Sequence, residues 1–293
     1  MSGNSYIGTA CSILLTLFRF TGAGPQVTQA LIRNEEPPAA FTEAMDQICQ
    51  KARAQGCRIW VDSEQDAVQT SIDRWAIPFM RKYNKNANGS ALVYNTLQAY
   101  LKHSRSKLQS QLALAQQEGW TLAIKLVRGA YIDSDPRERI HNTKEDTDDS
   151  YNGIVHDLLS GTNLGFTPET MPKVQLFLAG HNPASVNAAI DLMQSLSAAG
   201  KLQTKPEFGQ LQGMADELGC SVLQRADGLR EQGAGAVPLV YKCLTWGSVQ
   251  ECMQYLLRRA VENSGGTARM KDGYRAYMGE LRRRMGEAIR LRA

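Results

Sequence analysis

The sequence predicts an α/β fold built on a parallel β-sheet, and three observations support this prediction. Short apolar runs alternate along the chain with longer stretches of helical period. Such alternation is typical of parallel strands joined by crossover helices. The 293 residues, 43% of them hydrophobic, suffice for one large α/β domain with a sizeable core. No internal repeat, low-complexity run or linker interrupts the pattern, so we expect residues 1–293 to form a single domain.

Seven strands and seven helices are expected, in strict alternation after the first strand. The candidate strands are Ile13–Phe20, Cys57–Asp62, Ala91–Thr96, Thr121–Val127, Val174–Ala179, Glu207–Leu211 and Val237–Leu244. The helical patterns cover residues 39–55, 64–83, 98–118, 147–160, 184–198, 215–226 and 248–263. Gly56, Gly119 and Gly200 follow three of these helices, where glycine is favoured as a C-terminal cap.

The net charge of +4 is concentrated near the end of the chain, where residues 269–293 hold eight basic and three acidic side chains. The pattern predicts a basic terminal helix over residues 264–293. Two interpretations are open for this helix. It is either a solvated surface helix or a contact for an anionic membrane surface, to which each basic residue contributes about 1 kcal/mol. We expect no nucleic-acid partner.

The spacing of the cysteines, the length of the apolar runs and the lack of two common motifs exclude several classes of site. The six cysteines show neither metal-ligand spacing nor a secretory context, so we expect reduced thiols in an intracellular compartment and no metal site. The longest clean apolar run, Ala10–Phe18, is too short to cross a bilayer. No dinucleotide-binding fingerprint and no nucleophile elbow is present.

Two adjacent arginines, Arg258 and Arg259, lie in the middle of the last predicted helix. Ser248 followed by Glu251 predicts a capping box at its start. Paired guanidinium groups suit a carboxylate ligand, which accepts two parallel hydrogen bonds from each. Glu262, four residues after Arg258, is placed to orient that arginine. The alternative is a solvated helix face with an ion pair worth less than about 1 kcal/mol.

Three motifs in this order suggest a family. They are Lys125-Leu-Val-Arg-Gly-Ala-Tyr131, Leu211-Gln-Gly-Met-Ala-Asp216 and the Tyr-Leu-x-Arg-Arg-x-x-Glu-Asn pattern of residues 255–263. Over residues 12–284 the chain resembles proline dehydrogenases, and residues 242–247 resemble fungal members in particular. The resemblance implies FAD as cofactor and oxidation of L-proline to 1-pyrroline-5-carboxylate, with a quinone as electron acceptor. It also implies a mitochondrial location, although residues 1–10 contain no arginine-rich presequence.

The implied fold is a (β/α)8 barrel whose last helix lies over the barrel mouth. Aligned by motif, the strand at residues 13–20 corresponds to the second strand of such a barrel, so the first strand is expected to be missing from this chain. Two alternative functions therefore stay open. One is a hydroxyproline dehydrogenase, and the other is a truncated, non-catalytic remnant.

Ten residues are implied as cofactor ligands. Arg128 is suited to a pyrophosphate, and Gly129 with Ala130 permits close approach of the backbone to a ligand. The resemblance implies that Thr143 and Lys144 contact the AMP half of FAD, whereas the acidic residues after them are often only helix caps. A lone histidine such as His181 is more often structural. The full set is Gln98, Lys125, Val127, Arg128, Gly129, Ala130, Thr143, Lys144, His181 and Asn182.

Substrate contacts are implied for a second set of residues. Asp62 either faces the substrate pocket or caps the following helix. Two positions depart from the family. Arg19 replaces a usual lysine and cannot act as a neutral base. Cys243 replaces a frequent tyrosine and leaves room for a ring hydroxyl. The full set is Arg258, Arg259, Tyr131, Asp62, Leu211, Cys243, Arg19 and Glu262.

Overall fold

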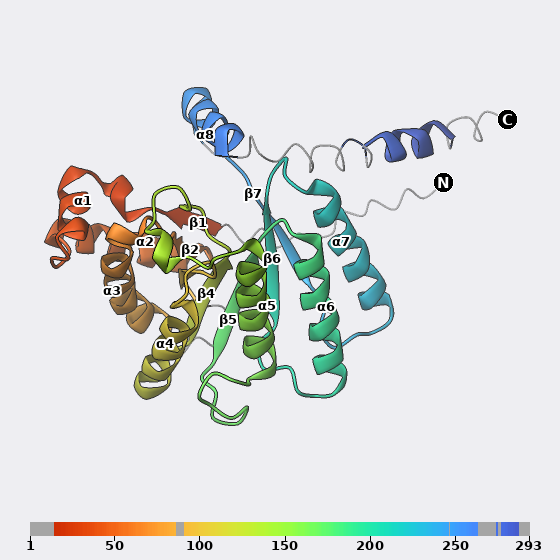
Figure 1. The fold of residues 1–293 in the computed structure, drawn as a ribbon, viewed down its shortest axis with the longest axis horizontal. Coiled ribbons are helices and arrows are strands. Elements are labelled where there is room, and N and C mark those ends of the chain that lie inside the picture. The colour runs from red at the N-terminus through yellow and green to blue at the C-terminus, as the bar shows by residue number, and fades with distance from the viewer. Residues whose placement is uncertain (1–14, 86–90, 246, 263–273, 275–276, 287–293) are drawn as a thin grey trace. The chain divides into compact units, whose positions relative to one another are not determined.

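A computed structural model describes residues 15–85, 91–245, 247–262, 274 and 277–286 (Figure 1). The chain divides into two compact units. The first unit comprises residues Met1–Leu178 and Ala199–Pro206, and the second comprises Ala179–Ala198 and Glu207–Ala293.

The first unit is built on parallel strands that follow one another in chain order. They are β1 (Leu15–Phe18), β2 (Arg58–Val61), β3 (Val93–Gln98), β4 (Leu122–Val127) and β5 (Val174–Ala179). Strands β2 and β3 are buried along their whole length, as is typical of parallel strands covered on both faces.

Helices connect these strands and contribute further buried side chains to the core. They are α1 (Pro25–Ile32), α2 (Ala39–Ala54), α3 (Asp66–Tyr83), α4 (Ser104–Glu118) and α5 (Lys144–Ser160), with short 3-10 turns η1 (Phe20–Ala23) and η2 (Arg137–Arg139). Phe41 on α2 packs against Phe20 and Trp75, with ring centroids 5.0 and 5.3 Å apart. This aromatic cluster joins η1, α2 and α3.

The second unit repeats the same alternation. Its elements are α6 (Pro183–Ala198), β6 (Pro206–Leu211), α7 (Asp216–Glu231), β7 (Leu239–Cys243) and α8 (Val249–Glu262). Strands β6 and β7 pair in parallel, with Gln210 beside Lys242 and Leu211 beside Cys243. Lys242 forms an ion pair of 2.8 Å with Asp216 at the start of α7.

The α/β prediction is confirmed, because all seven expected strands are present and pair in parallel. The prediction of a helix over residues 98–118 is wrong at its start, since Gln98 ends β3 and α4 begins at Ser104. The main-chain amides of Ala99 and Tyr100 donate to the carbonyls of Val127 and Arg128, at 2.8 and 2.7 Å. These bonds continue the β3–β4 pairing beyond the strand ends and delay the helix.

Other helices also differ from the prediction: α3 begins at Asp66 rather than at residue 64, and α7 extends to Glu231 rather than ending at residue 226. Helix α5 begins at Lys144 rather than at residue 147, because Thr143 forms a capping box with Asp146. Helix α1 was not predicted, although Gly24 and Pro25 form an N-terminal start with proline at the first position.

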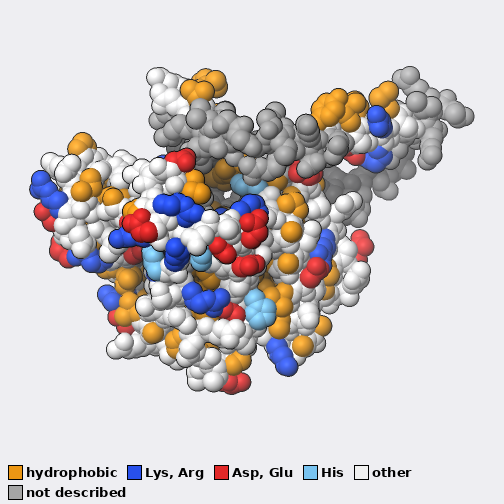
Figure 2. All heavy atoms as spheres, viewed as in Figure 1, with side chains coloured by type: hydrophobic (Ala, Val, Ile, Leu, Met, Phe, Trp, Pro, Cys, Tyr) orange, Lys and Arg blue, Asp and Glu red, His pale blue; other side chains and the backbone are white. Residues whose placement is uncertain are grey.

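At the end of the chain, residues 277–286 are helical, as the predicted basic helix requires. The remainder of 264–293, apart from residue 274, lies outside the described residues. Within the described part of the chain, no helix is long and apolar enough to cross a bilayer. On the face seen in Figure 2, basic and acidic side chains are interspersed among hydrophobic ones.

Candidate functional site

Three charged residues meet where β1, β2 and β4 end. The β1–β2 register pairs Phe18 with Val61, so Arg19 and Asp62 are the next neighbours along the same ladder. The Asp62 carboxylate forms an ion pair with Lys125 on β4. The Arg19 Nε atom lies 3.8 Å from Asp62 Oδ2. The structure therefore brings together three of the predicted site residues, at the strand ends where such folds place their active sites.

The principal partner of Asp62 is Lys125 rather than Arg19. The Lys125 side chain is 9% exposed, whereas that of Arg19 is 47% exposed. Lys125 also lies over the ring of Trp60, 5.9 Å from its centroid. Breaking an ion pair that is screened by solvent costs little, whereas removing one partner of a nearly buried pair costs more, because the other charge stays buried and unpaired. Asp62 does not serve as the N-cap of α3, because Gln65 occupies that position.

Replacing Lys125 with methionine is expected to lower the free energy of unfolding by about 2 kcal/mol, because it leaves a largely buried carboxylate without its main cation. Urea denaturation measures the change. The matched control is Lys82→Met, which removes the exposed ion pair between Lys82 and Asp46. Equal losses of stability in the two variants would contradict the importance assigned to Lys125.

Gln98 presents a buried acceptor without a partner. The side chain is 2% exposed, and its Nε2 atom donates to the carbonyl of Glu64 at 3.3 Å. Among the described residues, no donor reaches Gln98 Oε1. An unsatisfied buried acceptor costs about 1–3 kcal/mol, so such an atom in a native fold calls for a ligand or water donor. This atom fits the ring N–H of a bound flavin.

The predicted cofactor residues Arg128 and Lys144 are brought together by Asp148. Arg128 Nε donates to Asp148 Oδ1 at 2.6 Å, and Lys144 forms an ion pair with the other carboxylate oxygen. Burial raises the pKa of Asp148, but hydrogen bonds from Lys144 and Arg128 outweigh it, so that pKa lies below its usual value. The guanidinium of Arg128 also lies 4.4 Å from the ring centroid of Tyr151.

Thr143 acts as the N-cap of α5. Its Oγ1 atom accepts from the Asp146 amide at 3.0 Å, and its own amide donates to Asp146 Oδ2 at 3.0 Å. Thr143 therefore has a structural role as the N-cap of α5, and the first main-chain amides of this helix remain suited to a phosphate.

The segment after β4 passes from partial burial to exposure. Val127 and Arg128 are half-buried, whereas Gly129 and Ala130 are exposed. Gly129 has a φ of +147°, a region that favours glycine. Tyr131 follows, half-buried, with its carbonyl accepting from the amides of Ser134 and Asp135. The exposed backbone here suits a ligand that approaches closely.

In the second unit, three predicted residues are adjacent. The Leu211 amide donates to His181 Nε2 at 3.0 Å, which fixes the proton of the neutral ring on Nδ1. Leu211 pairs in register with Cys243 on β7. Asn182 Oδ1 accepts from the amides of residues 184 and 185, at 2.9 and 3.3 Å, and so caps α6. His181 and Asn182 thus also have structural roles.

The main chain of Arg258, Arg259 and Glu262 belongs to α8. Their side chains lie outside the described part of the structure. Their roles remain predictions from the sequence.

Sequence reasoning missed one buried carboxylate beside the site. Glu64 is 6% exposed, and its two oxygens accept from the amide and the hydroxyl of Thr21. Its carbonyl is the acceptor for Gln98. Glu64 lies two residues after Asp62, the end of the predicted strand, and this position was the available signal.

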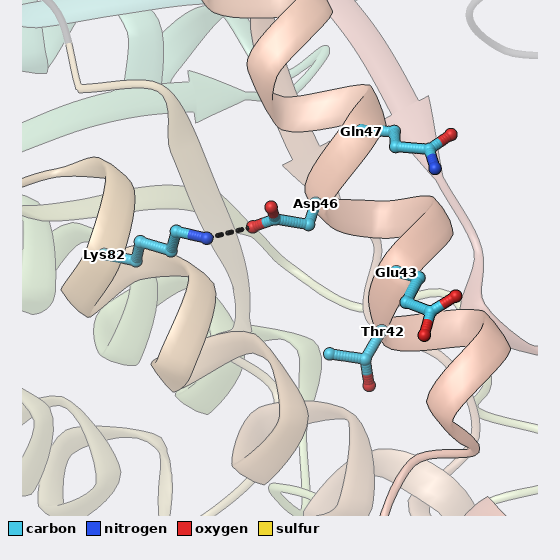
Figure 3. Close-up of a pocket in the computed structure, with 5 residues that line it drawn as sticks. All are labelled: Thr42, Glu43, Asp46, Gln47 and Lys82. Atoms are coloured by element: carbon cyan, nitrogen blue, oxygen red, sulfur yellow. Dashed lines mark hydrogen bonds and ion pairs between the residues drawn. The ribbon is translucent and has the colours of Figure 1, made fainter.

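An open groove on the outer helices contains none of the predicted site residues (Figure 3). It lies between α2 and α3, with the Lys82–Asp46 ion pair across it. Its lining residues are Thr42, Glu43, Asp46, Gln47 and Lys82. These side chains offer no arrangement typical of catalysis.

Parallel strands joined by helices, with charged residues gathered at the strand ends, define an α/β protein of the TIM-barrel class. A sequence family narrows this class. The family model for proline dehydrogenase matches residues 7–272, and the chain belongs to that family. The resemblance inferred from the three motifs is confirmed.

Similar proteins agree with this assignment. The probable mitochondrial proline dehydrogenase of Schizosaccharomyces pombe is 32% identical over 258 residues, which are 84% of this chain and 50% of that protein. Human hydroxyproline dehydrogenase is 30% identical over 246 residues, 83% of this chain and 51% of that protein. The chain thus spans about half the length of these relatives.

A solved structure supports the fold. Proline utilization A from Bdellovibrio bacteriovorus superposes with a TM-score of 0.64 at 20% identity, covering 84% of this chain and 24% of that one.

Proposed function

We propose that this protein oxidises L-proline to 1-pyrroline-5-carboxylate with FAD as its cofactor. The observation that carries the proposal is the buried Oε1 atom of Gln98, which no donor reaches among the described residues. It lies on the strand next to Lys125, whose ion pair with Asp62 places opposite charges at the strand ends. Membership of the proline dehydrogenase family supplies the reaction class.

The residues present fit a flavin. Gln98 Oε1 is suited to accept from the ring, and the exposed Gly129 and Ala130 are suited to the pyrophosphate beside Arg128. We assign the AMP half to Thr143 and Lys144 at the start of α5. The complete proposed set is Gln98, Lys125, Val127, Arg128, Gly129, Ala130, Thr143, Lys144, His181 and Asn182. Bound FAD would supply the hydride acceptor.

We assign substrate binding to the residues that the family resemblance implies. Arg258 and Arg259 would hold the carboxylate, oriented by Glu262. Tyr131, Leu211 and Cys243 would enclose the ring. Asp62, an acceptor-only carboxylate, would attract the positively charged ring nitrogen. Arg19 adds positive charge beside Asp62 but cannot serve as a neutral base.

We further propose a membrane quinone as the electron acceptor and the mitochondrion as the location. Relatives from Schizosaccharomyces pombe, Drosophila melanogaster and human are named mitochondrial. The helix at residues 277–286 exposes Tyr277, Leu281 and Met285 together with basic side chains. An amphipathic basic helix of this kind suits contact with an anionic membrane surface.

Product analysis with an artificial electron acceptor tests the proposal. The purified chain, supplied with FAD and L-proline, is expected to yield a cyclic imine with two hydrogens fewer than proline, detected by mass spectrometry. Absence of product from folded protein with bound FAD would contradict the proposed reaction. Folded protein that neither binds FAD nor forms product would favour the non-catalytic remnant.

Hydroxyproline is a second candidate substrate because of Cys243. This small side chain is half-buried on β7, where Cys243 pairs in register with Leu211, and relatives from Bos taurus and human are named hydroxyproline dehydrogenases. We expect kcat/KM for hydroxyproline to lie within about a hundredfold of that for proline, and Cys243→Tyr to reduce it about tenfold by filling the space for the hydroxyl. Steady-state kinetics on both substrates decide. A preference for proline above a hundredfold would exclude this candidate.

A further inference from the structure

Two buried residues, Tyr100 and Asp135, join the connection after β4 to the connection after β3. Tyr100 is 4% exposed and Asp135 is 7% exposed. The Tyr100 hydroxyl donates to Asp135 Oδ2, and the main-chain amide of Asp66 donates to Asp135 Oδ1 at 2.8 Å. Both carboxylate oxygens thus have a donor, as buried polar groups require.

Asp135 also closes a turn onto a predicted substrate residue. Its own amide donates to the carbonyl of Tyr131 at 2.8 Å, and the amide of Ser134 donates to the same carbonyl at 3.0 Å. A displacement of Asp135 therefore moves the main chain that carries Tyr131.

The ring of Tyr100 supports the other end of this segment. The Tyr100 amide donates to the carbonyl of Arg128 at 2.7 Å. A Cβ atom added to Gly129 would lie 2.4 Å from Tyr100 Cδ1, so the main chain there rests directly against the ring. Tyr100 therefore contacts this segment at Arg128 and Gly129 and, through Asp135, holds the turn at Tyr131.

The end of the β4–α5 connection that lies near α5 also contacts Tyr100. The His141 amide donates to the carbonyl of Tyr100 at 2.8 Å. Leu101 and Ile140 form a buried hydrophobic cluster with Tyr100. Burial, and then the hydrogen bond to Asp135, raise the pKa of Tyr100, so its hydroxyl keeps the proton that it donates.

We propose that Tyr100 and Asp135 are positioning residues, which set the main chain of residues 128–131 for cofactor and substrate. For its catalytic consequence the inference rests on the proposed function, and for its conformational consequence on the geometry alone. A misplacement of about 1 Å at a reacting site can cost about a hundredfold in rate, so a pair that fixes this segment matters.

The test compares Tyr100→Phe, Asp135→Ala and the double variant with Tyr83→Phe. Tyr83 is a matched control, because its hydroxyl donates to Asp46 at 2.6 Å on the outer helices, where Figure 3 shows Asp46 facing Lys82. Amide hydrogen exchange over residues 128–141 is followed in the flavin-free protein. KM and kcat for proline are measured after FAD is added.

We expect both Tyr100→Phe and Asp135→Ala to raise the rate of amide hydrogen exchange in residues 128–141 about tenfold. Both variants should also raise KM for proline about tenfold, with a smaller change in kcat. The double variant should equal Asp135→Ala, because both changes remove the same bond. Tyr83→Phe should leave both readouts unchanged.

Identical exchange and KM in Tyr100→Phe and Tyr83→Phe would overturn the inference, even if Asp135→Ala failed to fold. A wild-type protein that neither binds FAD nor oxidises proline would refute the proposed function instead. The exchange measurement would still decide whether the pair fixes residues 128–141.

Discussion

Replacing Arg258 or Arg259 with methionine is expected to raise KM for proline about a hundredfold, while the flavin content stays unchanged. A hydrogen bond to a charged group contributes about 1.5–3 kcal/mol, and every 1.4 kcal/mol is a factor of ten in affinity. Methionine keeps the unbranched stem and the helix preference of the side chain but removes all of its donors. Steady-state kinetics and the flavin-to-protein absorbance ratio measure the two quantities.

A matched control for the arginine variants is Arg225→Met. Arg225 on α7 forms an ion pair with Asp191 on α6, and neither is a predicted site residue. We expect its KM to equal that of the wild type. An unchanged KM in both Arg258→Met and Arg259→Met would remove the assignment of the substrate carboxylate to this helix.

Gly129→Ala is expected to abolish flavin binding and to lower the free energy of unfolding by about 2–4 kcal/mol. A φ of +147° disfavours any side chain, at a cost of about 1–3 kcal/mol. The added methyl group would also lie 2.4 Å from the ring of Tyr100, which is buried and has no free space to move into. Thermal or urea denaturation and flavin titration measure the two effects.

The control separates backbone strain from the contact with Tyr100. Gly119 also has a positive φ, of +70°, but an added Cβ would meet nothing within 4 Å. Gly119→Ala is expected to cost only about 1 kcal/mol and to retain flavin binding. If both alanine variants retained flavin equally, the close approach at Gly129 would have no functional importance.

The strands and their order could be predicted from the sequence because each is a short apolar run between turn residues. Strand β5 was predicted with its observed bounds, Val174–Ala179. Helix starts were predicted less well, since they depend on particular hydrogen bonds. The capping box of Thr143 and Asp146 can be recognised in the sequence, but the pairing of Tyr100 with the end of β4 cannot.

The sequence indicates which charged residues lie near the strand ends, but not which of them pair with one another. Asp62 was found because it ends an apolar run, whereas Arg19 and Lys125 were implied by the family resemblance. Lys125 is the main partner of Asp62 because its side chain is buried more deeply than that of Arg19. The strand register and the exposure of each side chain show this difference, but the sequence does not. The bond between Tyr100 and Asp135 joins two connections that no local pattern relates.

The central claim, that this chain carries a complete proline-oxidising flavin site, is tested most directly by the visible spectrum of the purified protein. The spectrum is recorded before and after anaerobic addition of L-proline. A flavin band near one equivalent per chain that bleaches with proline is the predicted result. Folded protein that takes up no flavin, or flavin that proline does not bleach, would contradict the claim.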